Sequence, residues 1–271
     1  MEDITSTKFK ANPYNLNNTL VTENDIINIM KQLNINDFTI NNLALYQQSF
    51  IHKSYCHMKD YEEYSRPNNC LGLFDKSYET LEFLGDSLLG SCVSTYLYER
   101  YATHFKKDEG FLTKLKIRLV NGEQLSYLSD KLGFSKFIII SNHIETNCQG
   151  RENIHILEDV LEAFIGSLFL DTKSYDIVNN FIIHLLEENI DFSDLIMKDN
   201  NYKDQILRYF QHNFKVYPTY IHKYKDEDTN LFVCEILKET EIISNGSGLT
   251  KKKSEQDASK NALIFYGVIS E

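Results

Sequence analysis

The sequence predicts two domains, a larger all-helical domain followed by a smaller α+β domain with the order α-β-β-β-α. Apolar residues recur at helical spacing over most of the first 190 residues, and the pattern changes to short strand-like runs after about residue 200. Ten basic and ten acidic residues follow from Tyr202 onward, so the net charge of −11 arises entirely before it. We therefore expect a polar tail over 1–21, the helical domain over 22–196, a linker at 197–201 and the smaller domain over 202–271.

The helical domain is expected to begin after Thr22, whose side chain is suited to cap the segment ENDIINIMKQL. Further helical periodicity covers residues 43–56, 77–101, 111–132, 154–170 and 174–189. Between Cys56 and Ser77 the chain contains Pro67 and Gly72 and shows little periodicity, which indicates a long loop.

The smaller domain is expected to start with a helix over 202–212 and to end with one over about 251–266. The runs YPTYIHKY, LFVCEIL and TEIIS between them predict three strands. Three lysines, Lys251 to Lys253, stand at the start of the last helix. Free N–H groups and the helix dipole attract anions there, and lysines add full charges, so a phosphate backbone would suit this end. A solubilising helix start is the alternative.

Four acidic residues stand inside two otherwise apolar helical segments. Glu82 and Asp86 lie in LEFLGDSLL, and Asp159 and Glu162 lie in LEDVLEAFIGSLFL. Positions three or four apart share a helix face, so each pair points one way. Buried carboxylates need a counter-charge, which a divalent cation supplies. For either segment alone a solvated helix face is the alternative, and spacing does not choose between Glu158 and Asp159 as partner of Glu162.

Gly85 and Gly166 lie within the same two segments. A glycine inside a helix costs on the order of 1 kcal/mol relative to alanine, so it needs a compensating reason. Close approach of a neighbouring backbone is that reason, and it would bring the two acidic faces to one centre. We therefore expect the two helices to cross at these glycines.

Composition limits the classes of protein. The longest apolar runs fall far short of the roughly 18 residues that a membrane helix needs, and the opening residues lack a signal-peptide pattern. We expect no membrane partner and no export. The five cysteines are odd in number, scattered and without CxxC spacing, which argues against zinc and disulfides and favours a reducing compartment.

The segment SYETLEFLGDSLLG resembles the signature of the ribonuclease III family, and EDVLEAFIGSLFLD resembles that family's second acidic motif. LALYQQSFIHKSY and DEGFLTKLKIRLV are similar to two further segments of the family, and the C-terminal part resembles a double-stranded-RNA-binding domain. The resemblance covers about residues 24–268. It implies a helical endonuclease domain that forms a homodimer, holds Mg²⁺ (with Mn²⁺ as a substitute) and cuts double-stranded RNA in a staggered manner, leaving 5′-phosphate and 3′-hydroxyl ends.

By motif position, the resemblance implies that Glu82, Asp86, Asp159 and Glu162 are the catalytic, metal-binding carboxylates, which favours Asp159 over Glu158. Glu79 and Glu109 match further acidic positions of the family's active site. The C-terminal part resembles the RNA-binding module most clearly at Gly246, Gly248, Thr250, Lys251, Lys252, Glu255, Gln256 and Ala258. Of these, Gly248, Thr250, Lys251 and Lys252 are expected to bind RNA.

The RNA-binding module also departs from the family pattern. Leu207 and Arg208 stand where the first helix usually offers Gln and Glu, and the loop 225–230 reads KDEDTN in place of a Gly-Pro-x-His element. Both departures put minor-groove binding by this module in question.

Two rival functions remain at this stage. A protein that only sequesters duplex RNA would keep the C-terminal module and tolerate loss of the acids, all four of which are present. A helical redox carboxylate protein would bind iron, and the pair Glu152 and His155 has the spacing of such sites but occurs once. The expected location is the cytoplasm, or the host cytoplasm for a viral chain. The abundance of asparagine, isoleucine, lysine and tyrosine and the long loop suit a large DNA virus or an AT-rich eukaryote better than a typical bacterium.

Overall fold

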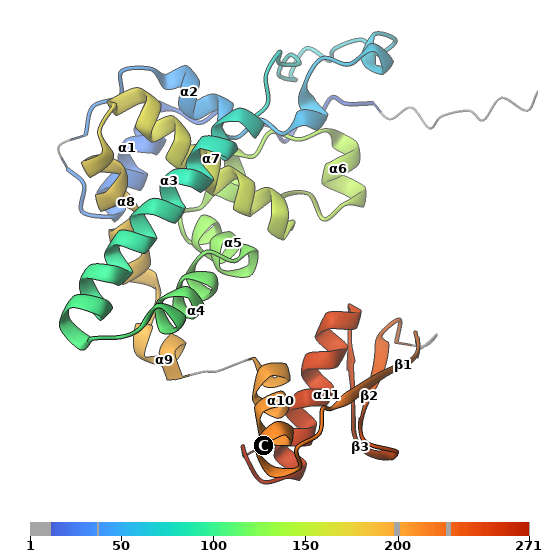
Figure 1. Cartoon of the computed structure of the whole chain (residues 1–271). Helices are drawn as coiled ribbons and strands as arrows, with labels where there is room; N and C mark the ends of the chain where they lie inside the picture. Colours follow the sequence, from blue (N-terminus) through green and yellow to red (C-terminus); the bar gives the residue numbers. More distant parts are fainter. Residues whose placement is uncertain (1–11, 37, 198–200, 226–228, 271) are drawn as a thin grey trace, which may run out of the picture. The chain divides into compact units, whose positions relative to one another are not determined.

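In this computed structural model the chain forms two compact units, one ending at Leu195 and one beginning at Ile196 (Figure 1). The structure describes residues 12–36, 38–197, 201–225 and 229–270. The first unit is helical and the second combines helices with a three-stranded sheet, so the predicted fold class is confirmed. Residues 198–200 of the predicted linker lie outside the described part of the chain.

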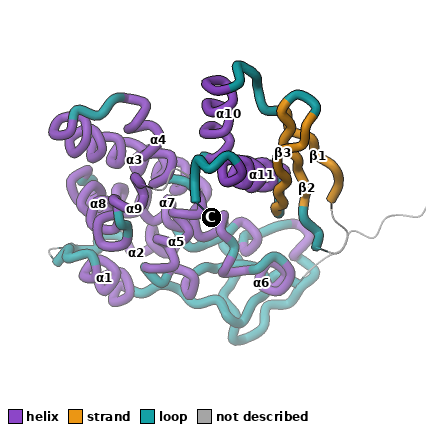
Figure 2. The backbone as a smooth tube through the Cα atoms, turned by 90° about the horizontal axis from the view of Figure 1, so that it is seen from below, coloured by secondary structure: helices purple, strands orange, loops and turns teal. Residues whose placement is uncertain are grey.

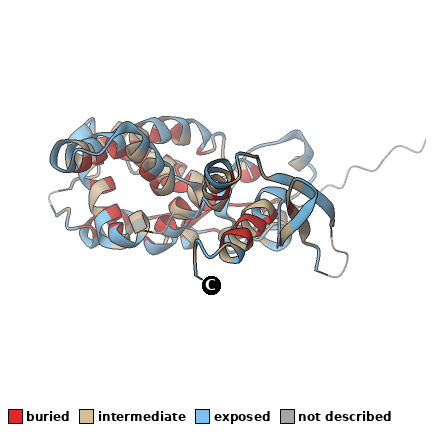
Figure 3. Ribbon diagram, turned by 60° about the horizontal axis from the view of Figure 1, so that its bottom comes forward, coloured by how far each residue is buried: buried red, intermediate tan, exposed pale blue. Residues whose placement is uncertain are grey.

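The helical unit is built around one central helix. Its helices are α1 (Glu23–Gln32), α2 (Leu43–Gln48), α3 (Glu79–Leu97), α4 (Glu109–Leu119), α5 (Gly122–Lys131), α6 (Asn142–Asn147), α7 (Ile154–Thr172), α8 (Tyr175–Asn189) and α9 (Phe192–Met197). The α7 helix packs against α2, α3, α5 and α8. Phe164, Ile165 and Leu168 of α7 are fully buried, and Figure 3 shows that buried residues line the faces where helices meet. The hydrophobic core of this unit is therefore centred on α7.

Local side chains explain where helices begin. Thr22 caps α1 as expected, and Thr22 and Asp25 form a reciprocal capping box. The single helix predicted over 111–132 is instead two helices, α4 and α5. The side chain of Asn121 accepts a hydrogen bond from the backbone N–H of Gln124 at 3.0 Å and so starts a second helix. Helical periodicity continues across the break and hides it.

The segment 12–21, which the sequence places in a polar tail, packs against the helical unit. The side-chain amides of Asn15 and Asn18 donate to the carbonyl of Ile140 at 3.2 and 2.9 Å, and Val21 is 1% exposed. Asparagines that satisfy buried backbone groups read in the sequence as solvent-facing residues, which is why the packing was not predicted. Residues 1–11 lie outside the described part.

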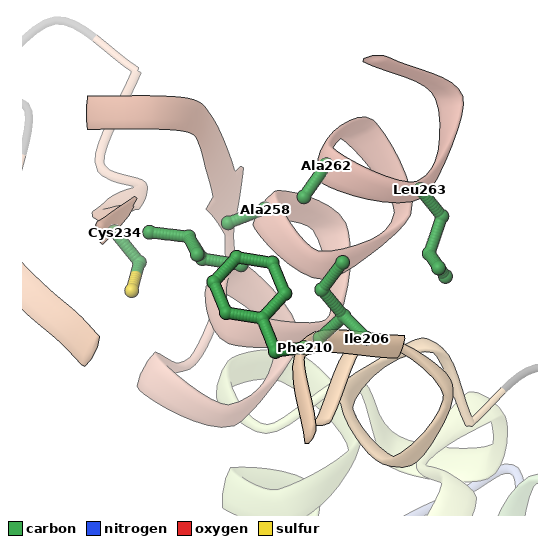
Figure 4. Close-up of a cluster of buried hydrophobic side chains, with 7 residues drawn as sticks. Ile206, Phe210, Cys234, Ala258, Ala262 and Leu263 are labelled. Carbon is green, nitrogen blue, oxygen red and sulfur yellow. The ribbon is translucent and has the colours of Figure 1, made fainter. Parts of the chain in front are cut away.

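The second unit contains α10 (Tyr202–Asn213), β1 (Thr219–Lys225), β2 (Phe232–Lys238), β3 (Glu241–Gly248) and α11 (Lys251–Phe265). The strands form an antiparallel sheet in the order β1-β2-β3, and α11 lies along it (Figure 2). The core of this unit joins α10, β2 and α11 (Figure 4) and consists of Ile206, Phe210, Cys234, Ile236, Ala258, Ala262 and Leu263. A Cβ on Gly246 would lie 2.0 Å from the backbone nitrogen of Ala258, so β3 and α11 touch through their backbones.

Candidate active site

The helices α3 and α7 cross in backbone contact. A Cβ built on Gly85 would lie 1.7 Å from the carbonyl oxygen of Glu162, and one on Gly166 would lie 2.2 Å from the carbonyl oxygen of Leu81. Side chains of any size would force the two helices apart. The expected crossing at these glycines is confirmed, and it brings the acidic segment of α3 alongside that of α7.

The crossing gathers acidic side chains from both helices into one electrostatically coupled region. Burial, followed by the charges of Asp159 and Glu79, raises the pKa of Glu82. Burial is also the main cause of the raised pKa of Asp159. Glu82 and Asp159 are half-buried, whereas Asp86 is exposed on α3. The carboxylates thus line a surface that is open to solvent on one side.

Glu162 is the most strongly perturbed acid of this region. Burial raises its pKa first, and the charges of Asp86, Glu158 and Glu82 add to the effect, so that the pKa reaches about 8 instead of 4.5. A carboxyl group with such a pKa resists ionisation at neutral pH unless a cation is supplied. A positive charge bound nearby would therefore favour ionisation of Glu162.

The two auxiliary acids lie in different surroundings. Glu79 begins α3 and is exposed, and its Oε1 accepts a hydrogen bond from Nζ of Lys53 at 3.1 Å. That interaction lowers the pKa of Glu79, and the charge of Lys53 also acts on Asp159. Glu109 begins α4, is exposed, and accepts a hydrogen bond from Thr113 at 2.9 Å. Glu79 thus borders the region of the four acids, whereas Glu109 contacts a residue of its own helix.

Two further groups lie beside these acids, and sequence reasoning named only one of them, Glu158, as the alternative to Asp159. Tyr78 donates a hydrogen bond to Oδ2 of Asp159 at 2.9 Å and is 2% exposed. Glu158 is half-buried, and burial followed by the charge of Asp159 raises its pKa. The spacing of Glu158 to Glu162 signalled its position, but a tyrosine before a helix carries no such signal. His52 is half-buried, and this burial lowers its pKa to about 4. Its ring accepts the backbone N–H of Ser54 and so caps a short 3₁₀ helix.

The chemistry of the side chains fits a hard divalent cation. The four acids offer only oxygen ligands, which hard divalent cations such as Mg²⁺ prefer. Within the described ranges, no group of three or more His, Cys, Asp or Glu side chains is already gathered closely enough to form a metal site.

In the second unit, the residues expected to bind RNA surround the start of α11. Thr250 caps this helix by accepting a hydrogen bond from the N–H of Lys253 at 3.1 Å. A Cβ on Gly248 would lie 2.7 Å from the nitrogen of Ser254, so this glycine allows β3 to approach the helix. Lys251 and Lys252 are exposed in the first turn. The structure thus exposes two lysines at a capped helix N-terminus.

The two unusual residues of α10 are placed differently from each other. Leu207 is half-buried, and Arg208 is exposed and forms an ion pair with Asp204 one turn earlier. Residues 226–228 of the acidic loop 225–230 lie outside the described part of the chain. Lys203 of α10 and His222 of β1 both contact the carboxylate of Glu255.

Comparison with known proteins identifies both units. The model of the ribonuclease III domain matches residues 79–173, and that of the double-stranded RNA binding motif matches residues 202–265. A ribonuclease 3 of Staphylococcus aureus is 33% identical over 228 residues, which cover 83% of this chain and 86% of that protein. This chain belongs to the ribonuclease III family.

Other members of the ribonuclease III family are also similar. A protein of Acanthamoeba polyphaga mimivirus named "Probable ribonuclease 3" is 40% identical over 200 residues, covering 72% of this chain. The match spans only 35% of that viral protein. The nuclease domain of ribonuclease III from Campylobacter jejuni is 29% identical, covers 61% of this chain and 98% of that domain, and has a TM-score of 0.49. Among the described residues, no helix combines the length and apolar character required to cross a membrane.

Proposed function

We propose that this chain is an endoribonuclease that uses a divalent cation to hydrolyse phosphodiesters of double-stranded RNA, in RNA processing or degradation. The backbone contact of α3 with α7 at Gly85 and Gly166 carries the proposal, because it brings acids from two helices to one partly buried place where their charges need compensation. Membership of the ribonuclease III family and the double-stranded RNA binding motif support the choice of RNA as substrate.

We assign the role of holding the cation to Glu82, Asp86, Asp159 and Glu162, and we propose Mg²⁺ as the natural ion with Mn²⁺ as a substitute. When bound, the ion would lower the pKa of an attacking water and neutralise charge on the phosphoryl oxygens. The backbone contact of α3 with α7 fixes the positions on the two helices from which these side chains extend. We assign auxiliary roles to Glu79, which borders the four acids, and to Glu109, which begins α4.

Two copies of the chain are needed to cut both strands of a duplex. Each copy carries one set of the four acids, and the antiparallel strands of RNA present equivalent phosphates related by a twofold axis. A symmetric homodimer through the helical unit would therefore make a staggered cut, leaving 5′-phosphate and 3′-hydroxyl ends. Phe83 supports this interface, because it follows Glu82 on α3 and its surface is 78% exposed.

The substitution Phe83→Ala is expected to weaken the dimer by about 10- to 1000-fold, since a buried aromatic anchor contributes roughly 1–4 kcal/mol to an interface. Analytical ultracentrifugation of the full chain measures the dissociation constant. Phe105→Ala is the control, because Phe105 is 64% exposed but lies beyond the end of α3. An unchanged dissociation constant for Phe83→Ala would place the interface elsewhere.

We propose that Lys251 and Lys252 hold RNA phosphates, with Thr250 and Gly248 shaping the start of α11 for that contact. Lys251→Ala is expected to weaken duplex binding similarly for all sequences and to reduce the slope of log K against log salt by about 1. Fluorescence anisotropy at several salt concentrations measures both quantities. Lys260→Ala is the control, because it removes the same charge from the opposite side of α11. Equal losses in the two variants would contradict a specific role for Lys251.

The direct test of the function uses a defined RNA duplex, purified full-length protein and Mg²⁺. We expect fragments whose sequenced ends carry 5′-phosphate and 3′-hydroxyl groups with a short 3′ overhang, and no cleavage in EDTA. Duplex that is bound but stays intact at all Mg²⁺ and Mn²⁺ concentrations would indicate a sequestering protein instead. We place the protein in the cytoplasm, or in the host cytoplasm for a viral chain, because all five cysteines are free thiols.

A further inference from the structure

A partly buried hydrogen bond links the two helices that carry the acids. The hydroxyl of Tyr78 donates to Oδ2 of Asp159 at 2.9 Å, and Tyr78 is 2% exposed. Tyr78 immediately precedes α3, whereas Asp159 belongs to α7. The bond therefore connects the beginning of one acidic helix to an acid of the other, next to the crossing of the two helices.

Tyr78 is itself held on several sides. Its backbone N–H donates to the carbonyl of Ile51 at 2.8 Å, and its ring lies against His52 with 5.8 Å between ring centroids. The carbonyl of Tyr78 accepts the N–H groups of Leu81 and Glu82 at 2.8 and 3.0 Å, which closes the first turn of α3. Because the backbone and the ring are both fixed, the hydroxyl presents a donor at a defined point.

We propose that Tyr78 is a positioning residue for the cation site: its hydroxyl donates to Oδ2 of Asp159 and so fixes the orientation of this carboxylate, and its carbonyl anchors the turn that carries Glu82. This inference rests on the proposed function. A carboxylate with one oxygen held by a rigid donor loses less rotational freedom when it binds an ion. Tyr78 thus fixes the position of one acid on each helix, Asp159 on α7 and Glu82 on α3.

The same helix contains a closely matched hydrogen bond outside the site. Tyr46 is fully buried and donates to Oδ2 of Asp171 at 2.9 Å, and Asp171 lies near the end of α7. Asp171 also accepts the backbone N–H groups of Asn41 and Asn42, which fixes the start of α2. Tyr46→Phe therefore removes a tyrosine–aspartate bond of equal length that is more deeply buried than that of Tyr78 and has no link to the four acids.

Mn²⁺ binding to the full chain, followed by calorimetry or by loss of the free-ion signal in electron paramagnetic resonance, tests the inference without relying on cleavage. Tyr78→Phe is expected to weaken Mn²⁺ binding by about 10- to 100-fold, as is typical when a partner of a metal-binding carboxylate is removed. Tyr46→Phe is expected to stay within about twofold of the unsubstituted chain, although both variants lose a tyrosine–aspartate hydrogen bond.

The outcomes separate the two proposals. If the unsubstituted chain binds no Mn²⁺, both the proposed cation site and the role of Tyr78 fail. If it binds Mn²⁺ and Tyr78→Phe binds as tightly as Tyr46→Phe, the role of Tyr78 is overturned while the cation site stands. A selective loss in Tyr78→Phe, reversed at high Mn²⁺ concentration, supports the inference.

Discussion

Replacing Glu162 by glutamine is expected to reduce duplex cleavage on the order of 10³-fold or more, because the cation loses a charged ligand at the most buried position of the acidic region. Binding of duplex RNA is expected to persist, since the lysines of α11 belong to the other unit. Single-turnover cleavage and anisotropy on the same duplex measure the two effects.

The same variant is expected to be more stable than the unsubstituted chain when no cation is present and the pH is high. The pKa of Glu162 is raised from 4.5 to about 8 in the folded chain. A carboxyl group raised in this way favours folding while it is protonated, and that contribution disappears as the pH rises through 4.5 toward 8. At pH 8.5 the folded chain must hold a charged Glu162, whereas glutamine stays neutral. We expect a difference of about 1–3 kcal/mol after allowing for solvent screening.

Thermal unfolding in EDTA at pH 4 and pH 8.5 measures this difference, which should vanish at the lower pH. Added Mg²⁺ should stabilise the unsubstituted chain and not Glu162→Gln. Glu99→Gln is the control, because Glu99 is exposed and lies beyond the end of α3. Equal destabilisation of Glu162→Gln at both pH values would show that Glu162 has a structural partner instead of an unmet need for charge.

Gly85→Ala is expected to destabilise the helical unit by more than about 3 kcal/mol, or to prevent folding, because its Cβ would lie 1.7 Å from the carbonyl oxygen of Glu162. The neighbouring backbone cannot rotate away as a side chain could, so α3 and α7 must separate. Denaturant unfolding followed by circular dichroism measures the loss.

Gly90→Ala provides a control on the same helix. A Cβ there would meet only Nζ of Lys116, at 3.6 Å, so the substitution should stabilise the protein by about 0.5–1 kcal/mol through helix propensity. A Gly85→Ala variant as stable as Gly90→Ala would mean that the helices do not touch at this crossing.

The roles of the acidic segments and their glycines could be predicted because each places a residue type where it is unfavourable in a buried helix. Charged residues in an apolar helix and glycine in a helix interior both cost free energy, and one close helix crossing accounts for both costs. Periodicity likewise predicted the helical unit and the sheet of the second unit. The helices, the strands and the acidic segments follow from residues that lie close together in the sequence, and such patterns can be recognised without the fold.

Features that depend on contacts between distant segments could not be predicted in the same way. The bond from Tyr78 to Asp159 spans 81 positions, and the bonds from Asn15 and Asn18 to Ile140 span more than 120. Tyrosine and asparagine both also occur at solvent-exposed positions, so their local sequence does not reveal that they have a buried partner. The break between α4 and α5 was hidden because helical periodicity runs through it.

The central claim is that acids from α3 and α7 hold one cation at their crossing. Anomalous scattering from a crystal of the full chain soaked in Mn²⁺ tests it most directly. We predict a strong peak beside Gly85 and Gly166 with carboxylate oxygens from both helices as ligands. A peak bound by one helix alone, or no peak at this crossing in a chain that cleaves duplex RNA with Mn²⁺, would contradict the account.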